Sequence, residues 1–137
     1  FLTGSCLKKG TVATTYFHDH HNLFVAGSSP DDMLFAVNRI RELQGGFLTV
    51  KDGRILSGLA LPVCGLLSEK SIRENGLALK AVRKSLTDLG YVHNNPIMSV
   101  GTLGLPVSPA LKLTDKGLVD VKKGEIVPLI VNTKKNK

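Results

Sequence analysis

Two stretches near the start of the chain have the composition of β-strands. Residues 11–17 are rich in β-branched and aromatic side chains, which favour an extended backbone. Residues 23–26 are almost all apolar, a pattern typical of a strand that is covered on both faces. Two further short strands are predicted nearer the C-terminus, at residues 118–121 and 127–131.

A hairpin is the clearest local prediction. Residues 47–51 and 54–56 flank Asp52-Gly53, and this pair tolerates the positive φ angles of a type I′ turn, whose twist matches that of the flanking strands. The apolar segment that follows, residues 59–67, is broken by proline and glycine. It is therefore predicted to be a buried loop or a sheet edge.

Two helices are predicted from apolar residues spaced three and four apart. The first begins at residues 28–30 with a serine cap and a proline and ends at Gly45-Gly46. The second begins with Ser71 and Glu74 in a capping box and ends before Gly90. Their apolar stripes are Met33, Ala36, Val37, Ile40 and Leu43, and then Leu79, Val82, Leu86 and Leu89.

The order of these elements predicts a two-layer α/β domain with a mixed sheet and about two main helices. A chain of 137 residues is long enough for one core. We expect one domain over residues 1–132 and a basic tail over residues 133–137. Because Phe1 is not preceded by an initiator methionine, we also expect the domain to be the truncated C-terminal part of a longer protein.

Charge and composition narrow the classes of molecule that the chain is expected to bind. The net charge of +7 lies largely in the tail and in lysine pairs, and aromatic residues are not interleaved with it, so nucleic acid is not an expected partner. No apolar run reaches the roughly 20 residues of a membrane span. Cys6 and Cys64 are far apart and form no C-x-x-C motif, which favours reduced thiols and a cytoplasmic protein.

Three of the four histidines lie in the run His18-Asp19-His20-His21-Asn22. In a strand, His18 and His20 would share a face and could ligate a metal. In a turn, Asp19 could orient an imidazole and leave its other nitrogen for a substrate or a neighbouring domain. Alternatively, the polar side chains bond backbone groups and are purely structural.

The carboxylates elsewhere are interpreted structurally. Asp31 and Asp32 are expected to be helix-start charges, and Asp52 is expected to form its turn. No P-loop, dinucleotide fingerprint or nucleophile elbow is present.

The sequence resembles the C-terminal domain of bacterial adenine deaminase from about residue 7 to residue 131. The matching motifs, in chain order, are the histidine run with its apolar strand and Gly27, Asp32-Met33, Ala36-Val37-Asn38, Gly45-Gly46, Leu61-Pro62-Val63-Cys64-Gly65-Leu66, Asn95-Pro96, Leu105-Pro106-Val107 and Leu111-Lys112-Leu113-Thr114-Asp115-Lys116-Gly117-Leu118-Val119-Asp120-Val121.

The resemblance implies that this accessory domain belongs to a metal-dependent amidohydrolase that converts adenine and water to hypoxanthine and ammonia in purine metabolism. The family's metals, Mn or Fe, are held by an upstream barrel, so we expect no metal or other cofactor on this chain and no activity from it alone. His18, Asp19, His21 and Asn22 match the family pattern and are candidates for completing the active site. The implied partners are the upstream barrel, adenine and a further copy of the enzyme in a homo-oligomer.

The sequence departs from the family pattern at three places. His20 replaces a usual serine, residues 100–102 replace Leu-Ser-Phe, and Leu67 replaces methionine. These departures keep open a divergent relative that acts on another purine. The other alternative is a non-catalytic domain for packing or dimerisation.

Overall fold

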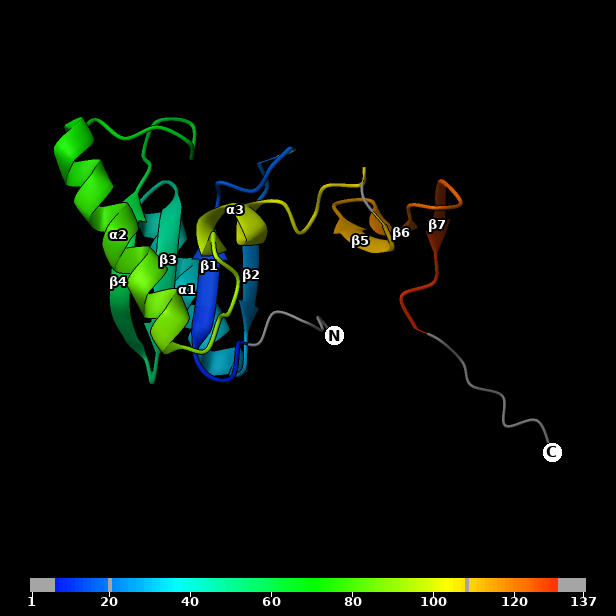
Figure 1. Cartoon of the computed structure of the whole chain (residues 1–137), viewed down its shortest axis with the longest axis horizontal. Coiled ribbons are helices and arrows are strands. Elements are labelled where there is room, and N and C mark those ends of the chain that lie inside the picture. The colour runs from blue at the N-terminus through cyan, green and yellow to red at the C-terminus, as the bar shows by residue number, and fades with distance from the viewer. Residues whose placement is uncertain (1–6, 20, 108, 131–137) are drawn as a thin grey trace.

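The main body is built on an antiparallel sheet with the strand order β2-β1-β3-β4 (Figure 1). The computed structural model describes residues 7–19, 21–107 and 109–130. The strands of this sheet are β1 (Thr11–Thr14), β2 (Phe24–Gly27), β3 (Gly46–Lys51) and β4 (Arg54–Ala60). The helices are α1 (Pro30–Glu42), α2 (Ile72–Asp88) and α3 (Pro96–Gly101).

The central strands β1 and β3 are covered on both faces. Val12 and Phe47 pack toward α2 and α3, whereas Ala13 and Leu48 pack toward α1. The predicted α/β class with two main helices is confirmed. The helices lie on opposite faces of an all-antiparallel sheet, so there are three layers where we predicted two layers and a mixed sheet. The reason is that both sets of alternating side chains on the central strands are buried, and each set needs a helix to cover it.

The predicted helix starts are confirmed. Ser29 caps α1 by accepting a hydrogen bond from the Asp32 N–H. Ser71 and Glu74 form the capping box of α2, and the Ser71 hydroxyl and N–H both donate to the Glu74 carboxylate. These two hydrogen bonds hold the pKa of the Glu74 carboxyl below its usual range.

Asp32 does more than we predicted for a helix-start charge. Its side chain is buried, and its two oxygens accept hydrogen bonds from the N–H groups of Asp52 and Gly53 at 3.1 and 2.8 Å. Those residues form the predicted turn between β3 and β4, and their φ angles of 52° and 68° confirm its type I′ character. Asp32 therefore ties α1 to the hairpin.

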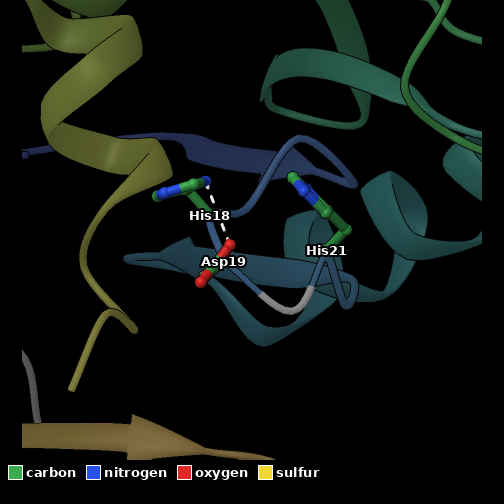
Figure 2. A group of neighbouring side chains, drawn as sticks. All are labelled: His18, Asp19 and His21. Atoms are coloured by element: carbon green, nitrogen blue, oxygen red, sulfur yellow. Dashed lines mark ion pairs between the residues drawn. The ribbon is translucent and has the colours of Figure 1, made fainter.

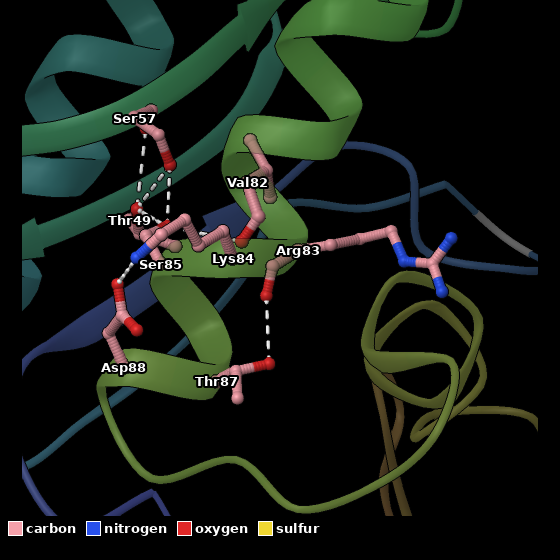
Figure 3. A network of polar contacts seen from close by, with 8 residues as sticks. All are labelled: Thr49, Ser57, Val82, Arg83, Lys84, Ser85, Thr87 and Asp88. Atoms are coloured by element: carbon pink, nitrogen blue, oxygen red, sulfur yellow. Dashed lines mark hydrogen bonds and ion pairs between the residues drawn. The ribbon is translucent and has the colours of Figure 1, made fainter.

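A ring of three hydroxyls joins α2 to the hairpin strands (Figure 3). The oxygens of Thr49, Ser57 and Ser85 lie 2.6 to 2.7 Å from one another, and Ser85 also donates to the Val82 carbonyl. Every hydroxyl in this buried ring has a partner, which removes the penalty of an unsatisfied polar group in the core.

Several elements differ from the prediction. The edge strand β2 is only half-buried. Asn95-Pro96 begins the short helix α3, with Asn95 as its cap, and this helix is not among the two that we predicted. Residues 59–67 divide into the end of the edge strand β4 and a turn, in agreement with a broken edge segment.

A second, three-stranded sheet follows the main body. It consists of β5 (Leu111–Thr114), β6 (Gly117–Asp120) and β7 (Glu125–Val127) in that order, all antiparallel. The prediction missed β5 and placed β7 too late in the chain. Figure 1 shows this sheet standing apart from the main body.

Three further predictions concern residues outside those that the structure describes: the basic tail at residues 133–137, His20 and the reduced thiol of Cys6. Among the residues that are described, no helix has the length and apolar character needed to cross a bilayer.

We predict that Leu86→Ala lowers the free energy of unfolding by about 2–5 kcal/mol, because the fully buried Leu86 side chain fills the interface between α2 and the sheet. Leu77→Ala on the same helix is the matched control, because Leu77 is 61% exposed. Its effect should stay within about 0.5 kcal/mol. Denaturant titration measures both, and equal losses for the two variants would contradict the assigned core.

Candidate functional site

The histidine run lies in the loop between β1 and β2 (Figure 2). Thr14 and Phe24 are paired across these neighbouring strands, so the two ends of the loop are fixed side by side. The buried Phe17 ring stacks on the Phe24 ring with centroids 4.5 Å apart, which anchors the loop to the sheet. The loop therefore presents its polar residues from a rigid base.

Backbone groups hold the loop in place. The His18 N–H donates to the Gly101 carbonyl at the end of α3, at 2.6 Å, and the His21 N–H donates to the Phe17 carbonyl at 2.7 Å. His21 has a φ of 51°, in the left-handed region. In the described part of the chain, no hydrogen bond joins the side chains of His18, Asp19 or His21 to a backbone group.

Three side chains of the loop lie together. His18 Nδ1 lies 3.6 Å from Asp19 Oδ1, and these side chains are 50% and 72% exposed. The ring of His21 lies 6.0 Å from that of His18, edge to face. The distance from His18 Nδ1 to Asp19 Oδ1 is too long for a hydrogen bond, so the orienting role of Asp19 stays a prediction. The strand interpretation is wrong, because His18 and Asp19 form a turn.

One buried atom of this cluster lacks a hydrogen-bond partner. His21 Nδ1 is buried and has no hydrogen-bond partner among the described residues. The ring of Tyr16 also lies near this imidazole, with the two centroids 6.3 Å apart. A buried polar atom left without a partner costs roughly 1–3 kcal/mol, so a ligand or neighbouring domain that supplied one would gain that energy.

Asn22, the fourth predicted site residue, is exposed and directly precedes Leu23 and β2. His93, the histidine outside the run, is exposed on the loop after α2, and its ring lies 5.1 Å from that of Tyr91. His93 is not part of the group formed by His18, Asp19 and His21.

Three side chains of the loop carry atoms that could ligate a metal ion. His18, Asp19 and His21 can each offer an atom within 4.8 Å of the others, and two imidazoles with a carboxylate suit Mn, Fe or Zn. A metal-bound histidine normally donates its second ring N–H to a carboxylate or carbonyl. In the described part of the chain neither imidazole makes such a bond, so these residues do not fit a resident metal centre.

Sequence reasoning missed the part played by Gly101. Its carbonyl accepts the His18 N–H, and a Cβ added to it would lie 3.3 Å from the Tyr16 carbonyl oxygen and 3.5 Å from the Tyr16 ring. Residues 100–102 are one of the places where the sequence departs from the pattern of the resembling family. That departure therefore lies directly against the histidine loop, although nothing in the local sequence signalled the contact.

Comparisons with known proteins identify the family. The model of the adenine deaminase C-terminal domain matches residues 1–125. "Adenine deaminase 2" of Shouchella clausii (strain KSM-K16) is 51% identical over 133 residues, which is 97% of this chain and 23% of that protein. "Adenine deaminase" of Clostridium perfringens (strain 13 / Type A) is 50% identical over 93% of this chain and 22% of its own length.

More distant relatives give the same result. "Adenine deaminase" of Brucella abortus (strain 2308) is 43% identical over 127 residues, covering 93% of this chain and 22% of that protein. The chain thus spans less than a quarter of the length of these relatives. The chain belongs to the family of adenine deaminase C-terminal domains.

Proposed function

We propose that this chain is the C-terminal part of a longer adenine deaminase, over residues 1–132, and that its β1–β2 loop completes the active site. The full-length protein would hydrolyse adenine to hypoxanthine and ammonia, whereas this chain alone would be inactive. The proposal is supported by the names of the relatives, which match this chain over 22–23% of their length.

The observation that carries the proposal is the buried Nδ1 atom of His21, which lacks a partner among the described residues. A purely structural histidine would be expected to satisfy this atom within its own fold. Here the unsatisfied atom lies on the same loop as the exposed His18–Asp19 pair. The loop therefore combines an incomplete hydrogen bond with groups that can hold and move protons.

The chemistry assigns these residues a supporting part. Deamination of adenine requires a proton at the ring nitrogen next to the reacting carbon and a second proton on the departing amine. Asp19 lies where it can stabilise a protonated His18, and a shift of the loop on contact with the upstream domain would let the buried His21 Nδ1 form one hydrogen bond to the purine or to that domain. Asn22 adds an exposed amide that can donate and accept.

The metal would supply the nucleophile by activating water at neutral pH. We place it, as Mn or Fe, in the barrel domain that precedes this chain, because His18, Asp19 and His21 do not fit a resident centre. We further assign the full-length protein to purine metabolism in the cytoplasm as a homo-oligomer. Nucleic acid and membranes are not among its proposed partners.

Two observations support alternatives. The contact between Gly101 and the histidine loop places a departure from the family pattern beside the cluster, which favours a relative that acts on another purine. Exposed apolar residues outside the main body favour a non-catalytic domain for packing or dimerisation. Turnover of adenine compared with other aminopurines distinguishes the first alternative from the proposal.

We predict that His21→Ala in the full-length protein lowers kcat/KM for adenine by roughly 10²-fold, the lower end of the range for a lost proton-transfer group. His21→Asn should keep a hydrogen-bonding atom near the position of Nδ1, and asparagine also tolerates the left-handed backbone of this site. Its activity should therefore exceed that of His21→Ala. Release of ammonia and the absorbance change of the purine measure turnover.

His93→Ala is the matched control and should leave turnover unchanged, because His93 lies outside the cluster. Circular dichroism and thermal melting establish that each variant is folded. If His21→Ala were folded and as active as the parent protein, active-site completion would be ruled out and the packing role favoured.

We predict that the 137-residue chain retains less than one equivalent of metal after dialysis against Mn²⁺ or Fe²⁺, because the cluster lacks supporting hydrogen bonds. Elemental analysis measures the content. In the full-length protein, His18→Ala should leave the metal content unchanged. Stoichiometric metal in the chain alone, lost on His18→Ala, would instead assign a metal site to this loop.

A further inference from the structure

We infer that one face of the β5–β7 sheet is the surface by which this chain docks onto the part of the same polypeptide that precedes it. We call this surface the apolar face, and it consists of Leu111, Leu113, Leu118 and Val127. The inference rests on the proposed function, which assigns catalysis to that preceding part. It adds where the two parts meet.

The strand register places these four side chains on one face. Leu113 is paired with Leu118, and Leu118 is paired with Val127, and directly opposed residues in antiparallel strands point to the same side. Leu111 lies two residues before Leu113 and therefore shares its side. The row Leu113, Leu118 and Val127 thus crosses all three strands of the sheet, whereas Leu111 is paired on the same face with Asp120, which is itself paired with Glu125, so the apolar face has an acidic border.

This face is open in the described part of the chain. Leu111 and Leu113 are 54% and 56% exposed, Leu118 and Val127 are half-buried, and Figure 1 shows the sheet standing clear of α1, α2 and the four-stranded sheet. Strands of three or four residues form a marginal sheet in water unless their apolar face is packed against something. A contiguous apolar patch of this kind marks an interaction site.

The length of the relatives indicates what covers the face. The curated adenine deaminases match this chain over 22–23% of their own length, so more than three-quarters of each lies outside the matched region. The family model extends through residue 125 and therefore includes β5 and β6. The sheet is thus part of the family domain, and a large body of the same polypeptide is present to pack on it.

The position of the sheet agrees with this occupant. Residues 102–110 connect it to α3, whose last residue, Gly101, accepts the hydrogen bond from His18. Val107 on this connection is 74% exposed. This connection is therefore all that separates the apolar face, along the chain, from the end of α3 that holds the histidine loop.

The test compares hydrogen–deuterium exchange in the full-length protein and in the 137-residue chain. We expect the amides of β6 to exchange at least tenfold more slowly in the full-length protein. Leu113→Asp in the full-length protein should abolish that difference, because a buried carboxylate would oppose packing. The amides of β1 and β3 should keep their protection, which shows that the main body remains folded.

Leu34→Asp is the matched control, because Leu34 is exposed to a similar extent, 62%, but lies on α1. It should leave the exchange of β6 unchanged. Equal exchange of β6 in the full-length protein and the chain alone would overturn the inference, as would an identical result for the two variants. Protection of β6 in the chain alone that rises with concentration would also overturn it, because a second copy would then be the occupant.

This readout does not depend on adenine turnover. A full-length protein that protects β6 but does not deaminate adenine would refute the proposed function and leave the docking surface in place. A protein that turns adenine over but does not protect β6 would refute only the docking surface.

Discussion

The fold depends on the burial of β1 and β3 on both faces. Val12 and Ala13, adjacent in sequence, enter different hydrophobic clusters on opposite sides of the sheet. Neither cluster can form without its helix. The helix caps stabilise α1 and α2, and the hydroxyl ring of Thr49, Ser57 and Ser85 fixes α2 on the sheet. The β1–β2 loop inherits its rigidity from the same strands, since its ends are fixed by their pairing.

Local chemistry accounts for what the sequence could predict. Capping residues such as Ser29 and Ser71, and the Asp52-Gly53 turn, act within a few residues, so their sequence patterns were sufficient. Long-range contacts were not accessible in this way. The bond from Asp52 to Asp32 spans 20 residues, and no local pattern shows that a helix-start carboxylate will cap a distant hairpin.

In the candidate site, too, the sequence predicted local features but not long-range contacts. The sequence identified the concentration of imidazoles beside a carboxylate. It left a strand and a turn open for this run, and only the structure shows the turn. The sequence did not identify Gly101, because that residue comes more than 80 positions later and contributes only a carbonyl group. The unsatisfied Nδ1 of His21 likewise becomes visible only when the neighbours that could have bonded it are known.

The anchoring of the histidine loop through peptide groups has an evolutionary consequence. The bonds from the His18 and His21 N–H groups require no particular side chain at either position. At His18 the side chain can therefore change while the path of the backbone is maintained, whereas the left-handed backbone at His21 favours residues such as asparagine or glycine. A loop anchored in this way can present different side chains without the domain acquiring a new fold.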